Sequence, residues 1–132
     1  MLNKVAVFFL LVIAGVIGVH QALNSGALLR YLDAHPNPAY VPKAEYYIGY
    51  AYYVIQDLDQ ATTYFLRASQ RYPKSPVAAP AYFAYINCLE DSPAASRATL
   101  IDEYQKYLTQ FPNGQSASVA RSRMDDYKTG AR

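Results

Sequence analysis

The sequence predicts an all-α protein in which a short stack of paired helices follows an N-terminal hydrophobic helix. Two observations predict this fold class. Three prolines, Pro36, Pro73 and Pro112, each follow an amphipathic stretch and recur at intervals of roughly 40 residues, a spacing typical of two-helix repeats. Because proline cannot continue a helix and disfavours helical geometry in the preceding residue, each of them marks a helix end. Ahead of them, the chain begins with a strongly apolar and almost uncharged segment.

This N-terminal segment has the composition of a membrane helix. Residues 5–19 are wholly apolar, and Lys4 is the only charged residue before Arg30. As a helix the apolar stretch spans roughly 22 Å, and its apolar flanks lengthen it toward the roughly 30 Å of a bilayer core. We therefore assign residues 1–23 to a signal-anchor or transmembrane helix and residues 24–132 to a helical domain. A cleaved signal peptide shares these features and is the alternative.

Lys4 also predicts the orientation of an anchored chain. Positive charge stays on the cytoplasmic side, so the N-terminus is expected in the cytoplasm and the helical domain outside. In a bacterium this describes a single-pass protein of the inner membrane with a periplasmic C-terminal domain. Cleavage of the segment would instead give a periplasmic or secreted protein.

The remaining helices follow from the proline positions and from the spacing of apolar residues. The predicted segments are residues 21–35 (a lone helix), 42–73 and 80–112 (a helix pair each) and 116–128 (a capping helix). The last segment carries its apolar residues three or four positions apart on one face, as a capping helix requires: Ala117, Ala120, Met124 and Tyr127.

Residues 42–73 resemble a tetratricopeptide repeat. The residues that carry the resemblance are Ile48, Gly49, Tyr52, Ala61, Phe65, Ala68 and Pro73, in a specific order of small and large side chains. The resemblance implies that the small residues lie where the two helices of the pair approach most closely. It also implies that Tyr52 and Phe65 fill the space between the helices. Glu45 departs from the pattern, which usually has an aromatic residue there.

The second pair, residues 80–112, matches the pattern less completely. It retains the core positions Ile86 and Tyr104 and the terminating Pro112. Asn87 stands where the first pair has Gly49, and Leu100 replaces a small residue. The resemblance therefore predicts a short tetratricopeptide-like solenoid with one regular and one irregular repeat.

Five tyrosines lie between positions 46 and 53, and helix geometry sorts them by face. Adjacent tyrosines at 46–47 and 52–53 do not fit the alternation of a half-buried strand. On a helix, Lys43, Tyr46, Tyr50 and Tyr53 share one stripe, whereas Tyr52 lies on the core face. The resemblance implies that this stripe, the groove stripe, lines a concave partner-binding groove. Three hypotheses stay open: the stripe binds a protein, packs against residues 21–35 or the apolar helix, or binds a small ligand.

The expected function is protein interaction. The aromatic-Pro-x-Ser pattern at residues 72–75 is similar to the repeats of bacterial envelope proteins of the outer-membrane-assembly lipoprotein and Tol-associated cell-division coordinator type. That resemblance implies a membrane-anchored scaffold or adaptor, exposed to the periplasm, that binds envelope or membrane-complex proteins. One alternative is a structural accessory subunit of a respiratory, photosynthetic or secretion complex. Another is a secreted peptide-binding repeat module.

Other function classes find no support in the sequence. The net charge of +2 comes from scattered basic residues, so a nucleic-acid partner is not expected. His20 and His35 lack metal-ligand spacing, the lone Cys88 between apolar neighbours is expected to be buried, and no cofactor motif is present. The adjacent acids at 90–91, 102–103 and 125–126 are expected on solvated faces. We therefore expect no enzyme, no metal, no cofactor and no small-molecule substrate.

Overall fold

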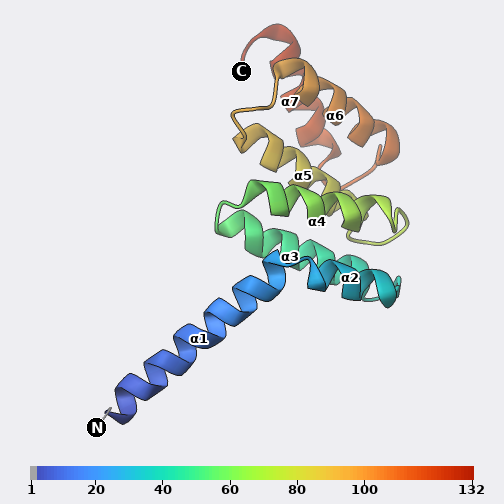
Figure 1. Cartoon of the computed structure of the whole chain (residues 1–132). Helices are drawn as coiled ribbons and strands as arrows, with labels where there is room; N and C mark the ends of the chain where they lie inside the picture. Colours follow the sequence, from blue (N-terminus) through green and yellow to red (C-terminus); the bar gives the residue numbers. More distant parts are fainter. Residues whose placement is uncertain (1–2) are drawn as a thin grey trace. The chain divides into compact units, whose positions relative to one another are not determined.

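A computed structural model describes residues 3–132, apart from the side chains of residues 23 and 24, and its regular elements within this part of the chain are all α-helices (Figure 1). The predicted all-α class is thereby confirmed. The helices are α1 (Lys4–Asn24), α2 (Ala27–Ala34), α3 (Val41–Val54), α4 (Leu58–Gln70), α5 (Ala78–Asp91), α6 (Arg97–Gln110) and α7 (Ala117–Thr129).

The chain divides into two compact units, Met1–Pro36 and Asn37–Arg132. The first contains α1 and α2, and the second contains α3 to α7. The sequence-based division after residue 23 falls near the end of α1 and separates it from α2.

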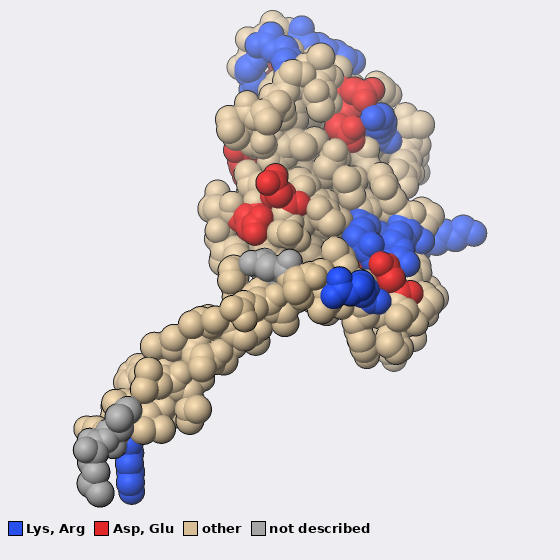
Figure 2. All heavy atoms as spheres, in the orientation of Figure 1, with Lys and Arg blue, Asp and Glu red and all other residues tan. Residues whose placement is uncertain are grey.

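In the first unit, α1 is long and apolar enough to cross a membrane. Its Lys4–Ala22 stretch has 19 residues and a mean hydropathy of 2.3, and its described side chains are exposed. The 21 residues of α1 extend about 31 Å, close to the thickness of a bilayer core. In Figure 2 the surface of α1 is tan along its length, with blue only at its N-terminal end, where Lys4 begins the helix. The same features suit a signal anchor.

The second helix of this unit is short and amphipathic. α2 follows the turn at Gly26, which has a positive φ of 70°, and it buries Leu32. At its C-terminal end the His35 ring Nδ1 lies 2.9 Å from the carbonyl oxygen of Tyr31. A helix before the first helix pair is thus present, with His35 at its C-cap, but residues 21–24 of the predicted segment 21–35 belong to α1 instead.

In the second unit each helix packs against the next one along the chain, from α3 to α7 (Figure 1). The helix pairs α3–α4 and α5–α6 correspond to the two pairs predicted from the proline positions. α7 packs against α6 and buries Ala117, Ala120 and Met124, while Tyr127 lies partly buried against the same core. The predicted capping helix is therefore present.

The closest approach between α3 and α4 occurs at Gly49. A Cβ atom built there would lie 2.8 Å from Cδ1 of Phe65, a side chain with only 1% exposure. On the facing helix Ala61 and Ala68 are fully buried. These small residues are therefore buried, and Phe65 fills the space beneath Gly49.

The two helices of the second pair, α5 and α6, pack less closely than α3 and α4, and Leu100 stands where the first pair has a small residue. Its core includes Ile86, Leu100 and Tyr104, which are all buried. The backbones of α5 and α6 approach each other at fewer positions than those of α3 and α4. Leu100 in place of a small residue accounts for this, because a larger side chain at a crossing point holds the helix axes apart.

Two residues assigned to the repeat core lie outside it. Pro73 and Pro112 are exposed, because α4 ends at Gln70 and α6 ends at Gln110, before each proline is reached. Ile48, also assigned to the core, is only half-buried. The two prolines end helices but contribute no core packing.

Gly49→Leu is expected to destabilise the protein, because the added side chain has no room beside the buried ring of Phe65. The expected loss in free energy of unfolding is roughly 1–3 kcal/mol or more. Ala51→Leu adds a similar side chain to an exposed position of the same helix and is the control. Thermal unfolding of both full-length variants in detergent, followed by circular dichroism, checks this. Equal melting temperatures would show that the assigned phase of α3 is wrong.

Candidate partner-binding surface

The structure brings the groove stripe together on one face of α3. The rings of Tyr46 and Tyr50 are 5.7 Å apart and those of Tyr50 and Tyr53 are 6.3 Å apart, both edge to face. The rings of Tyr46 and Tyr50 also lie 5.9 Å and 6.0 Å, respectively, from the ring of Phe65. Lys43 is exposed. The three tyrosines therefore form a continuous aromatic ladder over the buried Phe65.

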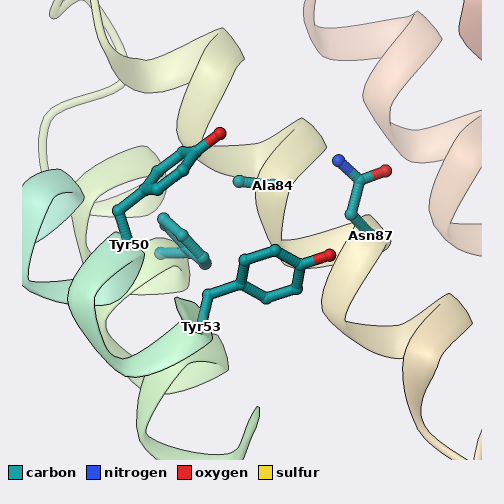
Figure 3. A pocket seen from close by; sticks show the side chains of 5 residues that line it. Tyr50, Tyr53, Ala84 and Asn87 are labelled. Carbon is teal, nitrogen blue, oxygen red and sulfur yellow. The ribbon is translucent and has the colours of Figure 1, made fainter. Parts of the chain in front are cut away.

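A small pocket lies beside this ladder. Figure 3 shows Tyr50 and Tyr53 projecting from α3 toward Ala84 and Asn87 on α5, with Phe65 completing the lining. The pocket volume of about 20 Å³ holds about one water molecule, whereas small-molecule sites measure roughly 300–1,000 Å³. The pocket therefore gives no support to the small-ligand hypothesis.

Tyr53 fixes one end of the ladder to the next helix pair. Its hydroxyl donates a hydrogen bond of 2.7 Å to Oδ2 of Asp91, at the end of α5. This hydrogen bond, together with burial, raises the pKa of Tyr53 to about 12. Tyr53 therefore has an internal structural role, while Tyr50 retains 47% exposure at the centre of the ladder.

Tyr52 lies on the core side of α3, as the helix phase predicts. It is only 3% exposed and stacks on Tyr64 of α4, with ring centroids 5.6 Å apart. The two hydroxyls are buried and have no hydrogen-bond partner among the described residues. Burial raises the pKa of Tyr64 to about 12. Two adjacent tyrosines of α3 thus serve different purposes, one in the core and one at the edge of the groove.

Glu45 is fully buried, an arrangement that sequence analysis missed. Its Oε1 lies 3.0 Å from Nε of Arg67 and 3.7 Å from Nη1 of Arg71. A buried carboxylate requires such cationic partners, because its desolvation is otherwise very costly. The available signal was a pair of arginines four positions apart, Arg67 on α4 and Arg71 at its C-cap, combined with an acid at position 45, where the repeat pattern expects an aromatic ring.

The expectation of solvated acid pairs is wrong for Glu90 and Glu103. Glu90 accepts hydrogen bonds from the hydroxyls of Tyr104 at 2.8 Å and Tyr127 at 3.0 Å, and pairs with Arg123 at 2.8 Å. Glu103 accepts a hydrogen bond of 2.7 Å from the hydroxyl of Tyr82. Both carboxylates accept hydrogen bonds from partly or fully buried tyrosines. Each of these tyrosines lies on a neighbouring helix, so the helix faces that carry Glu90 and Glu103 point toward other helices and not toward solvent.

Arg123 extends this network to the helix that lines the pocket. Its Nη1 donates to Oδ1 of Asn87 at 2.8 Å, so α7 holds a pocket-lining side chain on α5. The guanidinium carbon of Arg123 also lies 5.3 Å from the ring centroid of Phe83. The small pocket is therefore braced on its α5 side by the capping helix.

The described residues contain no group of three or more His, Cys, Asp and Glu side chains placed to hold a metal ion. Cys88 is fully buried in α5, as expected, and burial raises the pKa of its thiol to about 12. The thiol is therefore protonated at neutral pH and packs as a small apolar group.

Comparison with known protein families and with curated protein sequences finds no match for this chain. The residues of the groove stripe and their surroundings are therefore the basis for a functional proposal.

Stability is expected to fall above about pH 10. The pKa of Tyr53 is about 12 in the folded protein against 10.0 ordinarily, so ionisation favours the unfolded chain as pH rises through this window. Tyr53→Phe should lower stability at neutral pH by about 1 kcal/mol and make the alkaline loss shallower. Asp91→Asn should also make it shallower, and the two changes together should not add. Thermal unfolding from pH 8 to pH 11 measures this. An alkaline slope unchanged in both variants would contradict a folded-state bond between the two side chains.

Proposed function

We propose that this protein is a membrane-anchored adaptor that binds a protein partner through the groove stripe of α3. The observation that carries the proposal is the aromatic ladder of Tyr46, Tyr50 and Tyr53, which is exposed at its centre and braced at its end. Tyrosine rings on a fixed helix bury a large area on binding and lose little side-chain entropy. The tetratricopeptide resemblance supports the same surface.

Rigidity favours binding by this surface over a role in internal packing alone. Phe65 supports the rings of Tyr46 and Tyr50 from below, and the bond from Tyr53 to Asp91 prevents that ring from turning away. Tyr50 keeps 47% of its surface exposed although it contacts three aromatic neighbours. A preorganised surface of this kind binds without the entropic cost of ordering its side chains.

The proposed location follows from α1 and Lys4. A helix of this length and hydropathy, with a single positively charged side chain at its N-terminal end, supports a signal anchor with a cytoplasmic N-terminus. In a bacterium the repeats would then extend into the periplasm and bind envelope proteins.

A second candidate function is a structural subunit of a membrane complex, which a feature of α1 favours. Added Cβ atoms at Gly15 and Gly18 would meet no atom within 4 Å, so α1 presents an open face of small residues. Such a face permits close approach by another membrane helix. This candidate predicts that partners bind α1, whereas the leading proposal predicts that they bind α3.

A photoreactive phenylalanine analogue in place of Tyr50, in the full chain in native membranes, separates the two candidates. We expect cross-links from position 50 to a protein partner and none from position 63, where Thr63 is an exposed control on α4.

With the purified partner, Tyr50→Ala should weaken binding by roughly 2 kcal/mol or more, about 30-fold, at nearly unchanged melting temperature. Tyr52→Ala should instead lower stability by about 3–5 kcal/mol. Partner binding that survives Tyr50→Ala with full affinity would refute the groove proposal.

A further inference from the structure

A second row of large side chains runs along α3 and is not part of the groove. Tyr40, Tyr47, Val54 and Ile55, here called the outer stripe, are 72%, 68%, 71% and 62% exposed. The first three are spaced seven positions apart, so they lie on one side of the helix at intervals of two turns. Such a row of large exposed side chains is a candidate interaction surface.

The charges around the outer stripe differ between its two ends. Lys43 is exposed in the first turn of α3, and Glu45, the other charged residue of this helix, is fully buried. At the opposite end, Asp57 and Asp59 lie two and four positions after Ile55. The N-terminal end of α3 therefore presents aromatic rings together with a cation, and the acids lie at the C-terminal end.

The chain also ties this N-terminal end to the anchor. Only residues 25–40 separate the end of α1 from the start of α3, and eight of them form α2, about 12 Å long. Even with the other residues fully extended, the connection reaches at most about 40 Å. An anchored chain therefore keeps the start of α3 close to the bilayer, where even a weak surface affinity becomes effective.

We propose that the outer stripe of α3 rests on the surface of the bilayer, with Tyr40 and Tyr47 in the headgroup region. Tyrosine favours this region, because its ring reaches the apolar boundary while its hydroxyl stays in water. Lys43 lies beside anionic headgroups, and the acidic end of the helix stays further from them. The inference rests on the anchoring role proposed for α1 and does not depend on a partner in the groove.

This arrangement specifies where a partner binds. The groove stripe lies on the face of α3 next to the outer stripe, so docking of the helix on the bilayer holds Tyr46, Tyr50 and Tyr53 beside the membrane surface. The partner segment that reaches them is then itself membrane-proximal.

The chain contains no tryptophan, so a single Tyr47→Trp substitution gives a unique fluorescent probe in the full-length protein. The protein is reconstituted into vesicles of phosphatidylglycerol and phosphatidylcholine, with or without bromine on the acyl chains near the headgroup. We expect bromine to remove much of the emission of the Tyr47→Trp protein and less of that of Val54→Trp. Val119→Trp, at a 43% exposed position on α7, is the control and should lose none. Lys43→Glu, or vesicles of phosphatidylcholine alone, should reduce the quenching at Tyr47→Trp.

Each other outcome has a distinct meaning. Vesicle-bound Tyr47→Trp protein that bromine quenches no more than Val119→Trp would overturn the inference. A blue-shifted emission that grows with protein density, without quenching, would show that a second copy covers the outer stripe. Failure of the protein to float with the vesicles would refute the anchor and this inference together. If the groove stripe binds no partner, the photoreactive residue at position 50 will give no cross-links, while the quenching of the Tyr47→Trp protein will be unchanged. That result would refute the proposed function and leave this inference intact.

Discussion

The contact between Gly49 and Phe65 sets the rotational phase of α3, and the surfaces of this helix depend on it. Because a side chain at position 49 would clash with the ring of Phe65, the glycine lets α3 pack closely on α4 in the observed orientation. That orientation turns Tyr52 inward onto Tyr64, turns the groove stripe toward α5 and leaves the outer stripe exposed. One tyrosine-rich helix thereby presents a core face and two faces available for binding.

Hydrogen bonds from tyrosine to carboxylate then connect neighbouring helices, both within the α5–α6 pair and between α5 and the helices α3 and α7. Tyr53 reaches Asp91, Tyr82 reaches Glu103, and two further tyrosines share Glu90. A phenol supplies both a large apolar ring and a donor, so it can fill a helix interface and satisfy an acid that lies there. Four tyrosines thereby serve as both packing groups and partners of partly buried acids in the unit Asn37–Arg132.

The sequence predicted the helices and the first pair well, because glycine, alanine and proline act locally. Gly49, Ala61 and Ala68 are buried, and the faces of Tyr46, Tyr50 and Tyr52 follow from helix phase alone. Buried charge was not predictable in this way. The partners of Glu45 and Glu90 lie on other helices, and only three-dimensional packing brings the arginines and phenols to them. The exposure of Pro73 and Pro112 was missed because a helix-ending residue need not lie within the core.

The central claim is that one helix phase divides the tyrosines of α3 into buried, groove and outer positions. Hydroxyl-radical footprinting of the full-length protein, with oxidation of each tyrosine followed by mass spectrometry, tests it directly. With exposures of 68%, 47% and 3%, Tyr47 should oxidise fastest, Tyr50 next, and Tyr52 only after unfolding. Oxidation of Tyr52 in the folded protein as fast as that of Tyr47 would contradict the phase and, with it, both binding surfaces assigned to α3.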